Sequence, residues 1–541
     1  MHWKFWLDEP NTTYVEMWTE NHQILNHSIE YLAGQTFPDE IFTNNGQTGR
    51  WHMEHARTLL LQWIELRART GFSEWDSETY YPEDLAPLLN LVDFADDPEI
   101  ATRAAMMVDV ILFDTAVDSF YGQFGPSSGR ITAGSIRSAH GSMTTINALA
   151  WGQGKFTTTS NMGAVALATS RKYAVPPVIQ ALALDNPDEY LNFERQSFNI
   201  EEAAKYGLDI DDIHDTPRFW GMGAFTVPDM IDRTISSADA WDLWHYPDFK
   251  DLKDIAKVLQ AINGLPLASR LLDPDPNGVY MGEVNKVTYR TPDYMLSSAQ
   301  SFRPGEKGYQ QHIWQATLSP YAVVFTNNPD SLRSDDKHRP SYWMGNGRQP
   351  RTGQYQNVLI ALYDLPRYKS APRPLEARHY AFTHAYFPMW AFDEVIEQGG
   401  WVFGRSEDGY VALYSHLPYQ WVTEGPDSGQ EIVAPGYKNV WIIQLGRASV
   451  DGPFADFVSA VTEAGVTVAG LDVRYDAPGI GEMAFGWEGG LTVNGQDIPL
   501  SGYPRFDNPY AQVKFDSLLY EIEYQGMRLR LDFENGNRIV E

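Results

Sequence analysis

Apolar residues recur at helical spacing through much of the first half of the chain. Between residues 52 and 70 they fall three or four positions apart, and Gly71 follows as a helix-terminating residue. Asp97-Pro98 has the residue types of an N-cap and a first-turn proline, and residues 100–116 after it are apolar almost all round. The pattern predicts an amphipathic helix and then a helix buried between others.

Shorter segments of the same character extend this helical half. They are residues 21–33, 83–95, 162–168, 200–204 and 252–261. Gly, Ser, Pro, Trp and Tyr gather between them, so the units are helix–loop–helix units, as in a bundle, a solenoid or an (α/α) toroid. Because no repeat recurs at a fixed period, a regular solenoid is disfavoured. We expect residues 1–272 to form a helical domain of the (α/α) toroid type.

The pattern changes at residues 273–278, Asp-Pro-Asp-Pro-Asn-Gly, which have the composition of a linker or tight turn. Beyond them, period-two alternation becomes the commonest pattern. In residues 527–534, apolar Met, Leu, Leu and Phe alternate with charged Arg, Arg, Asp and Glu, which predicts a half-buried strand. Residues 466–468 and 471–475 behave similarly, and residues 440–445 are a short apolar run typical of a buried strand.

Two dipeptides in this second half, Asn494-Gly495 and Asn535-Gly536, are typical of β-hairpin turns. Short strands joined by such turns favour antiparallel pairing. We therefore expect residues 279–541 to form an antiparallel β-sandwich, so that the whole chain is a multidomain α and β protein.

Composition excludes several function classes. The 541 residues include 71 acidic and 41 basic ones, a formal net charge of −30, which argues against nucleic acid and disfavours an anionic membrane surface. The chain has no cysteine, which excludes a disulfide framework, a thiolate zinc site and a cysteine nucleophile. No apolar run approaches the roughly 20 residues of a membrane helix. The 17 Trp and 29 Tyr favour aromatic-lined surfaces and a carbohydrate ligand.

The first candidate site is Trp18-Thr19-Glu20-Asn21-His22-Gln23, at the start of a predicted helix. It places a carboxylate, an amide and an imidazole side by side where the helix dipole favours a developing anion. The alternative is a capping cluster with Thr19 as the N-cap.

The second candidate site is residues 71–81, a loop between two predicted helices. It contains the acids Glu74, Asp76 and Glu78 and the aromatic residues Trp75, Tyr80 and Tyr81. A surface loop with so many large aromatic side chains favours ligand binding, because exposed apolar area is unusual. The alternative is that the aromatic rings fill a gap between helices.

Two further segments offer polar groups. In residues 124–140, Arg130, Arg137 and His140 lie in a Gly/Ser-rich setting, where an arginine is suited to bidentate contact with a carboxylate. The strand half contributes His312, Trp314, Trp343, Asn346, Arg348, Arg351 and His384. We expect these seven residues to bind substrate at a sheet edge that faces the helical domain, or alternatively to pack at the domain interface.

Motifs for nucleotides and serine hydrolases are absent. No phosphate-cradling glycine loop occurs, and no G-x-S-x-G elbow lies between a predicted strand and a predicted helix. His52 and His55 lie three residues apart on a predicted helix, but two histidines without a further ligand favour a solvated helix face. We therefore expect no metal ligand set and no organic cofactor.

Two mechanisms fit a site rich in carboxylates, amides, His and Tyr. In β-elimination on a uronate polymer, a base removes the proton α to the carboxylate, an acid protonates the leaving oxygen, and donors stabilise the enolate-like intermediate. Asn21, His22, Tyr80, Tyr81, Arg130 and His140 supply these groups. In hydrolysis, two carboxylates act, and Glu20, Glu74 and Asp76 are the candidates. A non-catalytic glycan-binding protein is a third interpretation.

A helical half with an Asn-His pair, followed by a long antiparallel sandwich, resembles the polysaccharide lyases built as an incomplete (α/α) toroid plus β-sandwich. Chondroitin, hyaluronan, heparin and alginate lyases share that architecture. The resemblance implies that Asn21 neutralises the substrate carboxylate and that His22 is the base. It also implies Tyr80 or Tyr81 as the acid and Arg130 as a carboxylate partner. Glu20 beside the pair departs from that pattern.

Elimination on a uronic-acid-containing polysaccharide is therefore the favoured function, ahead of hydrolysis. A secreted or periplasmic location is favoured by the substrate class alone, because residues 1–6 lack the pattern of a secretory signal peptide.

Overall fold

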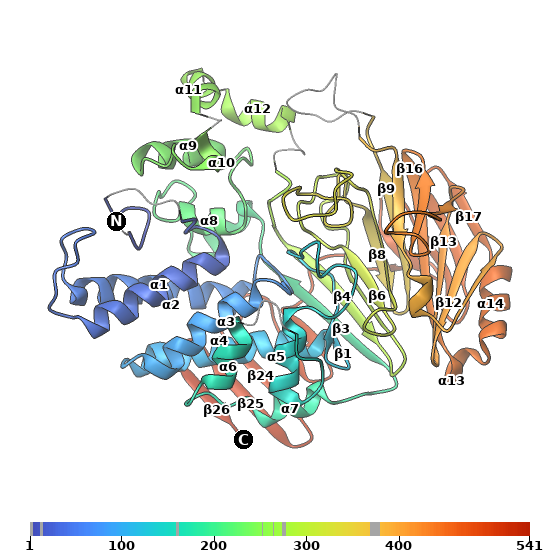
Figure 1. Ribbon diagram of the computed structural model, residues 1–541, viewed down its shortest axis with the longest axis horizontal. Coiled ribbons are helices and arrows are strands. Elements are labelled where there is room, and N and C mark those ends of the chain that lie inside the picture. Colours follow the sequence, from blue (N-terminus) through green and yellow to red (C-terminus); the bar gives the residue numbers. More distant parts are fainter. Residues whose placement is uncertain are drawn as a thin grey trace.

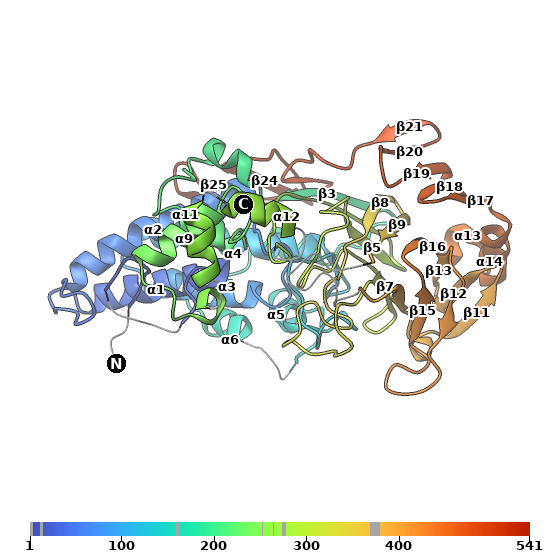
Figure 2. The ribbon, with the colours of Figure 1, turned by 90° about the horizontal axis from the view of Figure 1, so that it is seen from above.

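A computed structural model of the chain describes residues 4–10, 15–157, 162–250, 253–262, 264–272, 277–367 and 379–541. Most helices lie in the N-terminal half and the antiparallel sheets in the C-terminal part, side by side in Figures 1 and 2. The linker predicted at residues 273–278 lies mostly outside the described residues, since 273–276 are not among them.

The α-helices are α1 (Glu20–Thr36), α2 (Gly49–Thr70), α3 (Tyr81–Phe94), α4 (Pro98–Val117), α5 (Ser142–Trp151), α6 (Met162–Thr169), α7 (Pro177–Ala183), α8 (Thr216–Gly221), α9 (Ile231–Ala240), α10 (Pro247–Lys250), α11 (Lys253–Ala261), α12 (Leu265–Leu272), α13 (Ala448–Asp451) and α14 (Phe454–Glu463). The 3-10 helices are η1 (Ile200–Tyr206) and η2 (Met389–Ala391). The predicted helices are thus confirmed, except that the segment predicted at 200–204 is a 3-10 helix.

The strands of the first 327 residues are β1 (Ser119–Phe120), β2 (Gln123–Phe124), β3 (Tyr190–Gln196), β4 (Val284–Arg290), β5 (Met295–Ala299), β6 (Trp314–Thr317) and β7 (Val323–Asn327). Those up to residue 447 are β8 (Arg351–Tyr355), β9 (Val358–Asp364), β10 (Phe382–Tyr386), β11 (Glu394–Gln398), β12 (Trp401–Ser406), β13 (Gly409–Ser415), β14 (Gln420–Trp421), β15 (Glu431–Pro435) and β16 (Lys438–Arg447). The last are β17 (Val466–Ala469), β18 (Asp472–Ala477), β19 (Gly481–Phe485), β20 (Leu491–Val493), β21 (Gln496–Ile498), β22 (Phe506–Asn508), β23 (Ala511–Val513), β24 (Leu519–Tyr524), β25 (Met527–Asp532) and β26 (Asn537–Val540).

Local sequence signals set the boundaries of the long helices. Thr48 caps α2 by accepting a hydrogen bond from the backbone of Trp51, and Gly71 ends the helix at a φ of 72°. A left-handed φ of this kind favours glycine, which has no Cβ. Asp97 caps α4, and Pro98 opens it, as the sequence predicts.

Two large antiparallel sheets form a sandwich. The ten-stranded sheet has the order β14-β15-β10-β7-β6-β5-β4-β3-β22-β23, and the six-stranded sheet has the order β11-β12-β13-β16-β9-β8. Alternate residues of both sheets, such as Val324 of the first and Val411 and Ile443 of the second, share one buried core. The strands of this sandwich are mostly buried on both faces, as predicted for residues 440–445, whereas the segments with period-two alternation lie in other sheets.

A third layer covers the outer face of the six-stranded sheet. Helix α14 and the five-stranded sheet β17-β18-β19-β20-β21 pack there, with Phe457 and Val473 against Ile360 and Ile442. The two-residue turn Asn494-Gly495 joins β20 to β21 with both residues at positive φ, as expected for this hairpin.

Some strands do not lie in the half of the structure that their place in the sequence predicts. Strand β3, from the predicted helical range, lies inside the ten-stranded sheet between β4 and β22. The C-terminal sheet β24-β25-β26 packs on the helices (Figure 1). Leu529 there shares a core with Leu112, and Arg538 of β26 pairs with Asp109 of α4 at 2.5 Å. Sequence order therefore gives only an approximate division into two domains.

Within the described residues, no helix combines the length and the apolar character needed to cross a membrane.

Candidate functional site

The first turn of α1 gathers an amide and an imidazole around Thr19. The Thr19 hydroxyl donates to Oδ1 of Asn21 at 2.8 Å and lies 2.5 Å from Nδ1 of His22. The Asn21 amide donates in turn to Oε2 of Glu83 at 2.5 Å, on the first turn of α3. The start of α1 thus orients both side chains, as the sequence predicts. Glu83 joins them from α3, although no sequence motif singles it out.

Glu20, next in the sequence to Asn21, is a buried positioning group. Its carboxylate accepts the backbone N–H groups of Ser73 at 3.2 Å and Glu74 at 2.8 Å and pairs with Arg67 of α2 at 2.8 Å. These bonds attach the loop after α2 to the start of α1. Because both carboxylate oxygens are already bonded, Glu20 has little capacity left for substrate.

Arg130 and Glu74 form a buried ion pair beside this loop. Nε of Arg130 lies 3.1 Å from Oε1 of Glu74. Burial raises the pKa of Glu74 to about 7 even though Arg130 opposes the rise. Oε2 of Glu74 and Nη1 of Arg130 are buried without a hydrogen-bond partner among the described residues, so the pair has unused bonding capacity.

Tyr80 and His22 are the partly exposed members of this region. Burial and the Glu74 carboxylate raise the pKa of the Tyr80 phenol, while Arg130 opposes them. Burial lowers the pKa of His22, opposed by Glu83, so the imidazole is neutral at neutral pH. A neutral imidazole and a protonated phenol have the protonation states of a base and an acid.

The structure thus brings six groups together from three segments: Asn21, His22, Glu74, Tyr80, Glu83 and Arg130. We name this set the helix-end cluster. Five of the six are residues that the sequence singles out.

Tyr81 and Asp76 do not join the helix-end cluster. Both are fully buried: the Tyr81 hydroxyl donates to Asp114 of α4 at 2.8 Å, and Asp76 pairs with Lys286 of β4. The expectation of a surface loop at residues 71–81 is wrong, because residues 71–78 are buried between the helices and the ten-stranded sheet. Their polar groups find partners there instead of solvent.

Lys286 centres a buried ionic network between the helices and the sheet. Its Nζ lies 3.0 Å from both Asp118, the residue after α4, and Glu194 of β3, and Arg505 pairs with Glu194 at 2.6 Å. Burial raises the pKa of Asp118 and Glu194. Carboxylate oxygens of Asp76, Asp114, Asp118 and Glu194 lie within 4.8 Å of one another, but the ammonium group already supplies a cation there.

Trp18 and Trp75 are packing residues. Trp18 lies in an aromatic core with Trp220 and Tyr246, and Trp75 packs edge-on against Phe302 at 4.7 Å between ring centroids. Both are fully buried, so neither is available to stack on a sugar in this structure.

Most of the strand-half candidates are also buried. They are His312, Trp314, Trp343, Asn346, Arg348 and His384. His312 bonds Gln315 at 2.9 Å, and burial lowers its pKa to about 4. Arg351 lies elsewhere, over the ring of Phe485 in the third layer. Interface packing, the alternative offered by the sequence, describes Trp343, which packs with residues of the 131–139 segment, and His312, whose backbone pairs with Ser128. Trp314 lies instead in the core between the two sheets of the sandwich.

His384 is the most distinctive of these. Its Nδ1 lies 2.7 Å from Glu431, its ring stacks on Trp343 at 4.1 Å, and the Tyr342 hydroxyl also donates to Glu431. Its Nε2 is buried without a hydrogen-bond partner among the described residues.

His140 belongs to an exposed aromatic group away from the helix-end cluster. Its ring lies 5.0 Å from that of Tyr321, which lies 5.7 Å from that of Trp390. Trp390 is 62% exposed and Tyr321 41%. We name His140, Tyr321 and Trp390 the aromatic platform. Arg137 belongs to the same loop as His140 and pairs with Asp427 at 2.8 Å. Tyr321 and Trp390 could not be singled out from the sequence, since exposed aromatic residues match no motif.

Comparison of the chain with protein-family models and with curated proteins finds no match to either.

Proposed function

We propose that the protein is a polysaccharide lyase that cleaves a uronate-containing glycan by β-elimination at the helix-end cluster, and that its N-terminal helices form an incomplete toroid. One observation carries the proposal. His22, a neutral and partly exposed imidazole, lies in the same cluster as Asn21, Tyr80 and Arg130.

In this mechanism the residues have distinct roles. His22 takes the proton α to the uronate carboxylate, and the electron pair of that C–H bond forms the carbon–carbon double bond as the glycosidic C–O bond breaks. The Tyr80 hydroxyl gives its proton to the leaving oxygen. Arg130, through its unpartnered Nη1, and the Asn21 amide stabilise the carboxylate as negative charge moves onto it.

The neighbouring acids support this assignment. Glu83 accepts from Asn21, and Glu74 pairs with Arg130, so each carboxylate orients a group that contacts substrate. Glu20 positions the loop that carries Glu74. The aromatic platform offers an apolar surface on which the polysaccharide stacks outside the reacting unit.

Hydrolysis is the second candidate, and one observation favours it. A pKa of about 7 for Glu74 is typical of a general acid. Of the three carboxylates that the sequence offers for hydrolysis, Glu20 and Asp76 are buried and bonded. A hydrolase would therefore need Glu74 with Glu83 as its pair.

The test is a panel of acidic and neutral polysaccharides incubated with the full chain. Ultraviolet absorbance of the unsaturated uronate and new reducing ends are followed together. Both signals rising on a uronate polymer support elimination. Reducing ends without the absorbance overturn the lyase proposal in favour of hydrolysis, and binding without either signal identifies a glycan-binding protein.

A further inference from the structure

His52 is not on a solvated helix face, as its sequence pattern suggests, but fully buried between α1 and α2. Its Nδ1 lies 2.7 Å from Oε1 of Glu30, a buried residue of α1. His55, one helical turn further along α2, places its own Nδ1 3.0 Å from the same oxygen. Two imidazoles from one helix therefore converge on one carboxylate of its neighbour.

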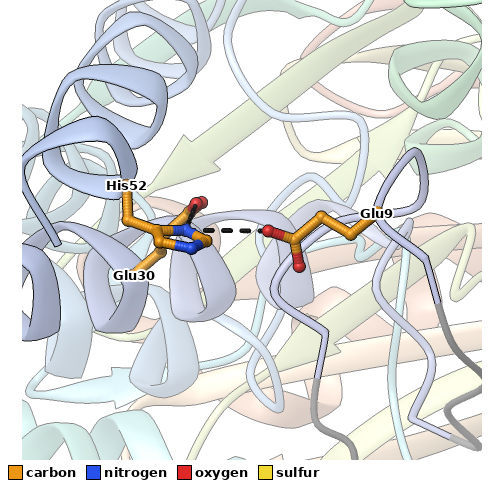
Figure 3. A group of neighbouring side chains, drawn as sticks. All are labelled: Glu9, Glu30 and His52. Atoms are coloured by element: carbon orange, nitrogen blue, oxygen red, sulfur yellow. Dashed lines mark hydrogen bonds and ion pairs between the residues drawn. The ribbon is translucent and has the colours of Figure 1, made fainter. Parts of the chain in front are cut away.

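A second carboxylate enters from the N-terminal segment. Oε1 of Glu9 lies 3.6 Å from Nδ1 of His52, the same nitrogen that Glu30 contacts, as the dashed line to Glu9 in Figure 3 shows. The other oxygen of Glu9 accepts from the backbone of Phe5 at 2.7 Å and from the Asn44 amide at 2.9 Å. These bonds orient Glu9 towards His52. One ligand atom from each of Glu9, Glu30 and His52 lies within 4.8 Å of the others.

Asn45 selects the ring nitrogen that faces the carboxylates. Nε2 of His52 lies 3.0 Å from Oδ1 of Asn45, whose amide nitrogen donates to Glu9 at 2.9 Å. Because that oxygen only accepts, Nε2 carries a hydrogen and Nδ1 of a neutral imidazole presents its lone pair to Glu30. Metal-binding histidines typically have such a partner on the second nitrogen.

We propose that Glu9, Glu30, His52 and His55 bind one divalent transition-metal ion of the zinc class. Imidazole nitrogen and carboxylate oxygen are ligands of Zn²⁺, and two carboxylates balance its charge. Ligand atoms around a tetrahedral ion at 2.0–2.1 Å are about 3.3 Å apart. Nδ1 of His52 lies 2.7 Å from Glu30 and 3.6 Å from Glu9, and these three residues form the set whose ligand atoms all lie within 4.8 Å of one another. His55, 3.0 Å from Glu30, lies outside that set and would move towards it to complete the site. Independently, Oε2 of Glu30 is fully buried without a hydrogen-bond partner among the described residues.

The ion would connect three segments of the chain. Glu9 belongs to the N-terminal segment, Glu30 to α1 and the two histidines to α2. None of the four belongs to the helix-end cluster, so the proposal is independent of the proposed function. Its expected effect is on the stability of the first two helices.

The experiment measures metal on the full chain. The protein is dialysed against a chelator, then against buffer with ZnCl₂, and bound zinc is counted by elemental analysis while the thermal midpoint is recorded. We expect roughly one zinc per chain and a raised midpoint. Co²⁺ in place of zinc should give the visible absorption of a four-coordinate site.

Three variants decide the outcome. His55→Gln removes a ligand whose side chain is 20% exposed, and Glu9→Gln removes one from the N-terminal segment, so both should fold. Each should weaken zinc binding by at least about tenfold. Glu54→Gln, an exposed acid between the two histidines, is the matched control and should bind as the wild type does. Absence of zinc from the wild-type chain, or equal zinc in all variants, overturns the proposal.

Discussion

The guanidinium Nε of Arg130 lies 3.1 Å from Oε1 of Glu74, and this ion pair joins the loop before α5 to the loop between α2 and α3. Both groups are buried, and each retains an atom without a hydrogen-bond partner among the described residues. An ion pair that keeps a donor and an acceptor unbonded can form hydrogen bonds with a further polar ligand. In the proposed elimination this ion pair is the part of the helix-end cluster that would hold the substrate carboxylate.

Replacing Arg130 with Ala and with Lys should distinguish the effect of its positive charge from the effect of its hydrogen bonds. In Arg130→Ala the Glu74 carboxyl loses its cation, so its pKa should rise further, and kcat/KM on the uronate substrate should fall by about 10²-fold or more. Arg130→Lys restores the charge without the planar fork and should recover only part of the activity. The control is Arg474→Ala, an exposed residue of β18. Equal activity in Arg130→Ala and the control contradicts the role of Arg130.

His22→Gln should abolish elimination while leaving the fold intact. Gln keeps a polar side chain of similar reach but cannot take a proton, so we expect kcat to fall by about 10²–10⁴-fold with a smaller change in KM. His416→Gln, at an exposed position after β13, is the control. Steady-state kinetics and the circular dichroism spectrum measure the two effects. Retained turnover in His22→Gln would assign the base to another residue.

Glu78 should make stability depend on pH. Burial raises its pKa from 4.5 to about 7, so the folded state holds a proton that the unfolded chain releases between these values. Its contribution to stability is thus present below pH 4.5 and lost as pH rises through 7. Glu78→Gln should remove this loss and exceed the wild type by about 2–3 kcal/mol at alkaline pH.

Urea unfolding across this pH range measures the Glu78 effect. Glu40→Gln, which alters an exposed acid, should keep the wild-type dependence on pH. Parallel curves for Glu78→Gln and the wild type would show that Glu78 ionises normally in the folded state.

Lys286 should be essential for folding stability. Lys286→Met leaves Asp76, Asp118 and Glu194 buried without their shared ammonium group, which should cost about 3–5 kcal/mol. Lys438→Met breaks a pair with Asp364 in which the lysine is 60% exposed, and should cost about 1 kcal/mol or less. Chemical denaturation of both variants gives the comparison. A similar cost for the two would mean that the carboxylates of the network are protonated.

Trp390→Ala should weaken substrate binding more than catalysis. Losing about 1–2 kcal/mol of stacking raises KM about 5- to 30-fold, with kcat little changed, because the platform does not contact the reacting atoms. Phe94→Ala, which truncates a ring 61% exposed at the end of α3, should change neither value. A fall in kcat with KM unchanged would show that the aromatic platform does not bind substrate.

Part of the candidate site could be predicted because its residues are close in sequence or share a local structure. Asn21 and His22 are adjacent at a helix start, and the capping pattern places them there before any tertiary contact is known. Glu83 carried a weaker signal, as an acid in the first turn of a predicted helix. Its bond to Asn21 spans 62 residues, and no local rule predicts a contact of that separation.

The errors have a common physical cause. Asp76 and His52 are expected at the surface because acids and imidazoles usually prefer water, and for Trp75 the sequence leaves both ligand binding and packing open. In the folded chain Lys286 neutralises Asp76, Glu30 pairs with His52, and Phe302 packs against Trp75. A polar group is buried where it finds a partner, and that partner is often distant in the sequence. The composition of a short segment therefore does not reveal which of its polar groups are buried.

The sequence by itself determined the secondary structure of most segments, the antiparallel pairing in the C-terminal part and the pair at the start of α1. These depend on periodicity, caps and turns, whose energetics extend over a few residues. Only the tertiary structure decided that β3 enters the ten-stranded sheet, that the C-terminal strands pack on the helices, and which acids are bonded. Those outcomes depend on which distant surfaces bury each other, a property of the whole chain.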